Sequence, residues 1–274
     1  MNQQQDSPNP QRFGLIVIGD EILSGKRIDK HMPKVIGLLA ARGLALSWAE
    51  YVGDDPQRIT AALVRAFASG DVVFSTGGIG ATPDDHTRQC AAAALGVPLA
   101  LHPQAEALIR ERMQDTAREQ GVPYEPDRPD NIHRLNMGVF PQGAEIIRNP
   151  YNKIPGFSVN TVHFVPGFPV MAWPMIESVL EDRYAHLFAA VGTSEKSVIV
   201  FGAMEATLTP LMLSIEERFA GIKVFSLPSV DHPVYGRHIE LGVKGDPQQI
   251  EAAYTLLLEG LHGFKAKLGP ELVR

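Results

Sequence analysis

The segment of this sequence best suited to chemistry is a glycine cluster followed by two acids. Its glycines and the hydroxyl side chains around them are Ser75, Thr76, Gly77, Gly78, Gly80, Thr82 and Thr87. Glycine lets a backbone approach a ligand closely, and the start of a following helix favours negative charge. Three glycines within four residues exceed the need of a plain tight turn, which is the alternative. We therefore expect a loop that binds the phosphate of a small molecule through its N–H groups.

Asp84 and Asp85 follow soon after these glycines. Carboxylates beside a bound phosphate repel it unless a divalent cation lies between them, and Mg²⁺ prefers carboxylate and phosphate oxygens. The charge balance therefore predicts a divalent metal, Mg²⁺ or a similar ion, bound by Asp84 and Asp85. The alternative for either residue taken singly is an ordinary helix N-cap.

Two more segments are expected at the same edge of the fold. Gly19, Glu21 and Ser24 come just after the first predicted strand, and Asp54 comes just after the second. Open α/β sheets bind ligands at the carboxyl ends of their strands, so these residues are candidates to line the pocket. The first segment is no P-loop. The number of residues between its two glycines differs by one from that of the P-loop motif, and Arg27 occupies the position of the Ser or Thr. For Asp54, helix capping is the alternative.

The elements that position these residues alternate between strands and helices. Continuous apolar runs predict buried strands, and amphipathic stretches predict helices. The predicted strands are 14–19, 44–52, 71–75, 144–148 and 158–165. The predicted helices are 28–42, 54–68, 85–95, 103–119 and one that runs from the turn at 166–169 to about 187, with a loop at 121–131. This order indicates a three-layer, doubly wound, mostly parallel α/β sheet.

A weak linker at 189–194 predicts a second, smaller unit. Its expected order is strand 196–201, helix 207–219, strands 222–226 and 237–243, and helix 247–261, an α+β arrangement. We therefore expect a disordered tail at 1–12, a first domain at 13–189 and a second domain at 195–268. No Gly-x-x-Gly joins the first helix of this unit to its next strand, so we expect a packing or dimerisation module and no nucleic-acid clamp.

Composition argues against several classes of protein. The net charge of -6 disfavours a broad cationic face for nucleic acid. No apolar stretch approaches the roughly 18 residues of a membrane helix. The polar start lacks a signal core, so we expect a cytoplasmic protein without membrane contact. The histidines lack metal-binding spacing and Gly-x-Ser-x-Gly is absent, which disfavours zinc chemistry and serine hydrolysis. Cys90, in an alanine-rich run, is expected to be a small buried apolar residue.

Three motifs, taken in chain order, carry a family resemblance. They are Gly19-Asp20-Glu21-Ile22-Leu23-Ser24-Gly25, Val52-Gly53-Asp54-Asp55 and Thr76-Gly77-Gly78-Ile79-Gly80-Ala81-Thr82-Pro83-Asp84-Asp85-His86-Thr87. They resemble the molybdopterin-binding family, with the molybdenum-cofactor-biosynthesis fold, and within it the N-terminal part of the CinA (competence/damage-inducible) proteins. The resemblance covers roughly 13–261 and extends through Pro166 and Gly167, which it places among the substrate-binding residues. It also implies a KH-type second domain and a homodimer.

This family offers two chemistries for such a pocket. CinA-like members cleave the pyrophosphate bond of ADP-ribose or FAD with a metal ion, and other members bind or adenylylate molybdopterin. The resemblance therefore implies hydrolysis of a nucleotide pyrophosphate, with Asp85 and Asp54 as catalytic residues. The partner is in either case a small molecule that carries phosphate, a nucleotide or a pterin. Non-hydrolytic molybdopterin binding and a non-catalytic, ligand-sensing protein are the alternatives.

Two segments depart from the CinA pattern. Asp29-Lys30-His31 replaces Asp-Thr-Asn, and Asn152 and Ile154 replace Gly and Ala in Asn-Pro-x-Gly-x-Ala-Pro-Gly. Loss of a glycine and gain of bulk change how closely a backbone approaches a ligand. We therefore expect both segments to line the pocket, and their changes to modify or abolish the family's activity.

Overall fold

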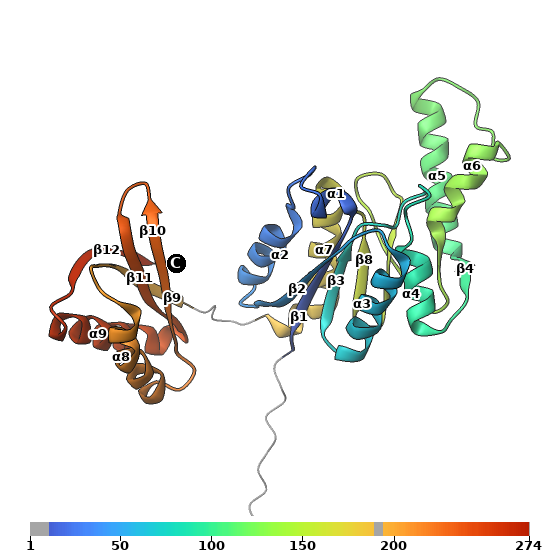
Figure 1. Ribbon diagram of the computed structural model, residues 1–274. Coiled ribbons are helices and arrows are strands. Elements are labelled where there is room, and N and C mark those ends of the chain that lie inside the picture. Colours follow the sequence, from blue (N-terminus) through green and yellow to red (C-terminus); the bar gives the residue numbers. More distant parts are fainter. Residues whose placement is uncertain (1–10, 189–193, 274) are drawn as a thin grey trace, which may run out of the picture. The chain divides into compact units, whose positions relative to one another are not determined.

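The computed structural model describes residues 11–188 and 194–273, which form two compact units (Figure 1). Unit 1 ends at Phe188, and unit 2 follows it. Most of the predicted tail and linker, 1–10 and 189–193, lies outside the described residues. Among the helices of the described residues, none is long and apolar enough to cross a bilayer.

Unit 1 is built on a six-stranded sheet. Its strands are β1 (Phe13–Ile18), β2 (Leu46–Val52), β3 (Val72–Thr76), β6 (Glu145–Ile147), β7 (Gly156–Val159) and β8 (Val162–Val165). They lie in the order β2-β1-β3-β8-β7-β6; the first four run parallel, β7 is antiparallel to β8, and β6 is antiparallel to β7. Every residue of β1 and β3 is buried, because these central strands are covered on both faces. The predicted mostly parallel α/β sheet is confirmed.

Helices cover both faces of this sheet, which gives three layers (Figure 1). The longer helices are α2 (His31–Ala40), α3 (Pro56–Ser69), α4 (Thr87–Leu95), α5 (Pro103–Glu119) and α7 (Pro169–Tyr184). On one face α2 and α7 pack against Leu15 and Phe74, and on the other α3 and α4 pack against Ile16 and Val73. Cys90, on α4, is buried as predicted, and burial raises the pKa of its thiol.

Local patterns missed several turns and short elements of unit 1. The predicted strand 158–165 is a hairpin of β7 and β8, because Asn160 adopts a φ of 52° in a two-residue turn. The predicted helix 28–42 begins only at His31, where Asp29 accepts hydrogen bonds from the N–H groups of His31 and Met32. The elements that were not predicted are α1 (Asp20–Leu23), the paired strands β4 (Leu99–Leu101) and β5 (Val139–Pro141), α6 (Pro129–Arg134), and 3₁₀ turns at Leu135–Gly138 and Ala185–Leu187.

Unit 2 is a four-stranded antiparallel sheet with two helices. Its elements are β9 (Ser194–Phe201), α8 (Glu205–Arg218), β10 (Lys223–His232), β11 (Gly236–Gly245), α9 (Pro247–Gly263) and β12 (Lys267–Val273). The strand order is β10-β11-β9-β12, and both helices bury apolar side chains against Val198 and Leu241. The predicted α+β order is present, but β12 was missed because Gly269 and Pro270 interrupt its pattern. The KH-type assignment stays a prediction.

Candidate functional site

A cavity of about 640 Å³, called the first cavity below, lies at the carboxyl ends of β1, β2, β3 and β8. Its walls come from the residues that follow these strands, from residues 149–155 and from the start of α7. The predicted site residues that line it are Gly19, Glu21, Asp54, Gly77, Gly78, Gly80, Thr82, Asp84, Asp85, Pro166 and Gly167. The parallel sheet therefore brings together the three motifs that the sequence singled out.

Steric crowding explains why glycine occupies the first two positions of the glycine loop, residues 77–82. Gly77 has a φ of 100°, and a Cβ there would overlap the carbonyl oxygen of Ile18. Gly78 has a φ of 67°, and its Cβ would overlap the hydroxyl of Thr87. A larger residue would need the backbone to shift at Gly77, and the Thr87 side chain to move at Gly78, in addition to the strain of a positive φ. The loop is therefore packed closely between the end of β1 and the start of α4.

Hydrogen bonds within the fold decide which N–H groups of the glycine loop are left for a ligand. The N–H of Gly77, predicted to hold phosphate, instead donates to the carbonyl oxygen of Val165 (3.1 Å) and joins the loop to β8. The N–H of Thr82 donates to Asp85 Oδ2 (2.8 Å). Four consecutive N–H groups between them make no hydrogen bond within the described residues, and all four residues line the first cavity: Gly78, Ile79, Gly80 and Ala81. Such a run of unpaired backbone donors is typical of an anion-binding concavity.

Asp85 supports the glycine loop as well as lining the cavity. Its Oδ2 accepts hydrogen bonds from the N–H (2.8 Å) and the hydroxyl (2.5 Å) of Thr82. Gly80 packs against the same carboxylate, since a Cβ there would lie 2.6 Å from Oδ2. The other oxygen, Oδ1, accepts no hydrogen bond from the residues that the structure describes. Asp84 also lines the cavity and is exposed.

Asp54 links the first two motifs. Its Oδ2 accepts a hydrogen bond from the N–H of Asp20 (2.9 Å), and its own N–H donates to Asp20 Oδ1 (3.2 Å). Burial raises the pKa of Asp54, and the charges of Asp20, Glu21 and Asp84 raise it further, against the hydrogen bond from Asp20, which lowers it. A carboxylate with a raised pKa accepts a proton more readily, as a general base must.

The acids alone do not make a complete metal site. Across residues 11–188 and 194–273, no three His, Cys, Asp or Glu side chains are grouped as ligands of one ion. Mg²⁺, however, commonly binds one or two carboxylates and completes its shell with water and substrate phosphate. Asp84 and Oδ1 of Asp85 suit that role, because both residues line the cavity that the unpaired N–H groups share. The predicted metal therefore fits this cavity as the partner of a bound phosphate.

Four residues that were predicted to bind substrate do not line the cavity: Ser24, Ser75, Thr76 and Thr87. Ser75 and Thr76 are buried within β3, where both faces of the sheet are covered. Thr87 is buried, and its hydroxyl donates to the carbonyl oxygen of Gly77 (3.0 Å), so it supports the loop from behind. Ser24 is exposed at the end of α1. The sequence showed that these hydroxyls flank the motifs, but not which way they point.

Several residues of the cavity wall were not proposed from the sequence. Among the described residues that line the cavity, Arg27 is the one basic residue, and the sequence marks it only as a mismatch to a P-loop. Its place beside the first motif could have identified it. The apolar part of the wall includes Ile18, Ile79, Met137, Pro155, Phe168 and Met171. Met137 comes from a segment that no motif marked, so no local signal could have found it.

The segment 149–156, which departs from the CinA pattern, lines the cavity as predicted, through Asn149, Asn152 and Ile154. Asn152 Oδ1 accepts hydrogen bonds from Asn149 Nδ2 (2.7 Å) and from the N–H of Ile154 (3.1 Å). Asn149 Nδ2 also donates to the carbonyl oxygen of Ile154 (3.0 Å). These bonds close the segment on itself and hold Ile154 at a fixed place in the wall.

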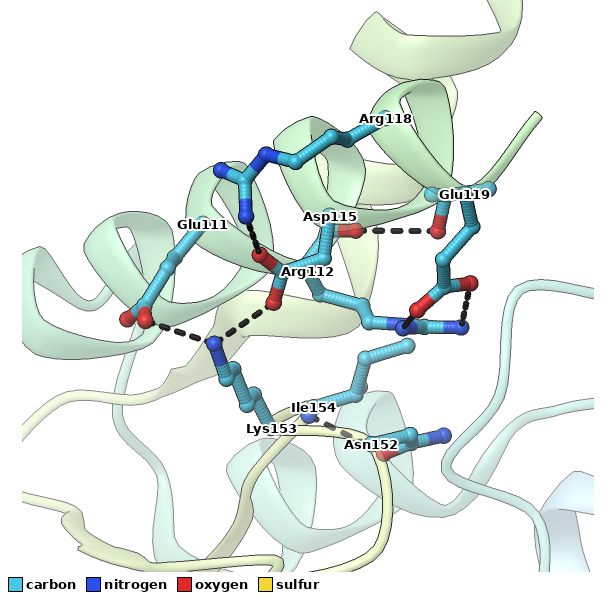
Figure 2. A network of polar contacts seen from close by, with 9 residues as sticks. Glu111, Arg112, Asp115, Arg118, Glu119, Asn152, Lys153 and Ile154 are labelled. Carbon is cyan, nitrogen blue, oxygen red and sulfur yellow. Dashed lines mark hydrogen bonds and ion pairs between the residues drawn. The ribbon is translucent and has the colours of Figure 1, made fainter. Parts of the chain in front are cut away.

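Lys153 anchors the same segment to α5 (Figure 2). The residue has a φ of 65°, and its Nζ donates to Glu111 (2.6 Å) and Asp115 (2.5 Å), as Figure 2 shows. Arg118 pairs with Asp115 as well (3.3 Å). The hydrogen bond from Lys153 lowers the pKa of Asp115, which favours the charged carboxylate that holds the ion pair. Part of the cavity wall is therefore tied to a helix that lies outside the motifs.

The segment Asp29-Lys30-His31 lies behind the cavity wall, so the prediction that it lines the pocket is wrong. Asp29 accepts a hydrogen bond from the hydroxyl of Tyr51 (2.8 Å) in addition to those at the start of α2. His31 is buried, and its Nε2 donates to the carbonyl oxygen of Gly167 (3.0 Å). The segment therefore acts on the cavity through Gly167, which does line it.

Several known proteins with a similar sequence or fold carry the CinA name. A CinA-like protein of Anaeromyxobacter dehalogenans is 35% identical over 160 residues, 57% of this chain and 37% of that protein. A CinA-like protein of Geobacter metallireducens is 31% identical over 272 residues, 96% of this chain and 61% of that protein. The crystal structure of the protein CinA, of unknown function, from Thermoplasma acidophilum matches with a TM-score of 0.53 and 26% identity, covering 63% of this chain and 98% of the other. The chain thus spans 37% and 61% of the two curated relatives.

The family assignment concerns the part of the chain that forms the first cavity. Residues 14–186 match the family described as "Probable molybdopterin binding domain". This stretch contains the glycine loop, both Asp54 and Asp85, and the strand ends around them. The chain therefore belongs to the molybdopterin-binding domain family.

Proposed function

We propose that the first cavity binds a phosphate ester of a nucleotide or a pterin. The observation that carries this proposal is the run of unpaired N–H groups at residues 78–81. A phosphate oxygen can accept from several of these donors at once, and charge-assisted hydrogen bonds are the strong ones. Arg27 adds a cation to the same wall, while the nearby acids require a metal ion if the ligand is to carry its full charge.

Within this cavity, the chemistry that the CinA relatives suggest is metal-dependent hydrolysis of a nucleotide pyrophosphate such as ADP-ribose or FAD. Residues 78–81 hold one phosphate group in place. Asp84 and Asp85 would hold a divalent ion, which would supply the positive charge that polarises the phosphoryl group and lowers the pKa of the attacking water. Asp54 accepts a proton from that water while the water oxygen forms a bond to phosphorus. The bond between this phosphorus and the bridging oxygen of the pyrophosphate breaks, and the bridging oxygen leaves with the second phosphate. The two products are phosphate monoesters, one of which is AMP.

Non-hydrolytic binding of molybdopterin is the second candidate. It is favoured by the apolar wall that includes Met137, Phe168 and Met171, which suits a planar ring. In this case residues 78–81 hold the terminal phosphate and no bond is broken.

Release of AMP from ADP-ribose or FAD, with Mg²⁺, Mn²⁺ or Co²⁺, tests hydrolysis on the full chain. Asp85→Asn keeps an oxygen that accepts from Thr82 but loses the charge, so the loop should hold and turnover should fall strongly. Asp127→Asn makes the same change at an exposed residue away from the cavity and should leave turnover unchanged. No AMP with any of the three metals rejects hydrolysis.

Calorimetric titration separates binding from turnover. Wild-type protein is titrated with ADP-ribose in the presence of metal, and with molybdopterin. Arg27→Gln, which removes the basic residue of the cavity wall, should weaken either ligand. Binding of molybdopterin without any turnover of nucleotides favours the second candidate. If neither ligand binds, the first cavity is not a phosphate-ester site.

A further inference from the structure

A second cavity, of about 340 Å³, shares the glycine loop with the first. Ala81, Thr82 and Asp85 line both cavities, so this part of the chain forms the wall between them. Among the other residues of the second cavity are Arg88 and Gln89 on α4 and His133 on α6, none of which lines the first. The proposed function does not use this cavity.

Arg88 is a buried cation in the wall of the second cavity. Its exposed fraction is 4%, its Nη2 donates to the carbonyl oxygen of Gly80 (2.6 Å), and its Nε has no hydrogen-bond partner. Burial lowers the pKa of Arg88, and the charge of Asp85 raises it, although these two side chains form no ion pair. Arginine is seldom buried without a paired anion, because desolvation of an unpaired charge is costly. An anion in the second cavity would supply the missing partner.

The start of α4 lies at the same cavity. His86 precedes the helix and provides no side-chain cap, and both His86 and Gln89 line the cavity. The N–H groups in the first turn of a helix lack internal acceptors and carry partial positive charge, which favours an oxyanion. The N–H of Thr87 donates to the carbonyl oxygen of Gly78 (3.0 Å), so the donors of this turn that remain for an anion are those of the next residues, Arg88 and Gln89. Together with the buried guanidinium of Arg88, they offset the carboxylate of Asp85, which lines the same cavity.

Two side chains of the second cavity also hold the glycine loop. Arg88 donates to the carbonyl oxygen of Gly80, and His133 Nε2 donates to that of Ala81 (2.8 Å). Gly80 and Ala81 provide two of the four unpaired N–H groups of the first cavity. A ligand that draws Arg88 towards itself therefore pulls on the peptide of Gly80, which belongs to the run of donors at residues 78–81.

We propose that the second cavity binds a small phosphate-type oxyanion through Arg88 and the first turn of α4, and that its occupation changes the affinity of the first cavity for its ligand. The coupling is reciprocal, as linkage requires. The coupling rests on the proposed function of the first cavity, whereas oxyanion binding to the second does not. Inorganic phosphate and the phosphate group of a small sugar phosphate share the recognised chemistry.

Equilibrium dialysis of labelled inorganic phosphate against the full chain tests the second cavity. Gln89→Glu places a negative charge in the cavity at an exposed position and should weaken phosphate binding about tenfold. Gln120→Glu makes the same change at the far end of α5, away from both cavities, and should bind as the wild type does. Competition by ribose 5-phosphate as strong as that by phosphate shows that a phosphate monoester is accepted; its failure to compete restricts the site to the free ion.

Two further variants separate this site from the first cavity. Arg27→Gln alters the first cavity only and should leave phosphate binding at the second unchanged. Arg88→Met should abolish phosphate binding at the second cavity. If that variant does not fold, the effect of Gln89→Glu on phosphate binding tests the site instead. The proposal is overturned if no phosphate binds, if Gln89→Glu binds like the wild type, or if Arg27→Gln removes all binding. A negative AMP assay leaves it standing, because that assay concerns the first cavity.

Discussion

Mild acid should destabilise unit 1 through one buried histidine. His163, on β8, lies between Ser158 on β7 (Oγ to Nδ1, 2.8 Å) and Tyr184 at the end of α7 (hydroxyl to Nε2, 2.7 Å). Burial, followed by the charge of Arg183, lowers the pKa of His163 from 6.5 to about 3. The network joins two strands and a helix whose other ends border the first cavity, at Gly167 among others. The stability of this network therefore bears on the site.

Acid lowers the stability because the unfolded chain binds a proton on His163 more tightly than the folded protein does. His163 stays neutral in the folded protein until the pH nears 3, whereas in the unfolded chain it is protonated below 6.5. The stability that neutral His163 gives the folded protein is therefore fully present above pH 6.5 and is lost as the pH falls towards 3. Each pH unit within this window costs about 1.4 kcal/mol. From about pH 7.5 to about pH 5.5, the free energy of unfolding should fall by about 1.4 kcal/mol.

Urea unfolding at these two pH values measures the loss. Both tryptophans, Trp48 and Trp173, lie in unit 1, so their fluorescence reports this unit alone. His163→Phe lowers stability at both pH values, but its pH-dependent loss should be about 1.4 kcal/mol smaller than that of the wild type. Tyr184→Phe removes a hydrogen bond, keeps the histidine and should keep the pH dependence. Equal pH dependence in the wild type and His163→Phe would refute the reasoning.

Three further predictions concern the loop, the cavity wall and the thiol. Gly77→Ala should lower the free energy of unfolding by at least about 2 kcal/mol and abolish ligand binding, because its Cβ overlaps the carbonyl oxygen of Ile18. Gly25 also has a positive φ but has nothing within 4 Å of its Cβ position, so Gly25→Ala should cost about 1 kcal/mol. Equal losses of stability in the two variants contradict this prediction. Ile154→Ala should enlarge the first cavity and raise its affinity for a bulky nucleotide, and unchanged affinity in calorimetry excludes the side chain as a barrier. Cys90 should react with a thiol reagent only after unfolding; rapid labelling of folded protein contradicts its burial.

Features that depend on neighbours in the chain could be predicted from the sequence. The continuous apolar runs of β1 and β3 identified central strands, and α5 has the predicted bounds, 103–119. The sequence placed an aspartate at the start of this helix, and Asp55, next to the candidate Asp54, caps α3 by accepting from the N–H of Arg58 (2.8 Å). The glycine loop was located because Gly77 and Gly78 need positive φ angles that other residues avoid.

Burial and hydrogen-bond partners across the fold could not be read from local patterns. The sequence showed three glycines, but the N–H of Gly77 is used by Val165, because β3 and β8 are neighbours in the sheet. It showed Thr87 beside the loop, but only packing of α4 against the loop turns that hydroxyl away from the cavity. Lys153 carries no motif, and only its contact with α5 makes it an anchor of the cavity wall.

By itself, then, the sequence determined the strand-loop-helix order and the place of its glycines and acids, because short-range sterics and hydrophobic period set these. The tertiary structure alone decided that the donors for a ligand are those of residues 78–81, and that Arg88 is buried behind them. The physical reason is that each backbone group and each charge must find its partner among segments that folding brings together from distant parts of the chain.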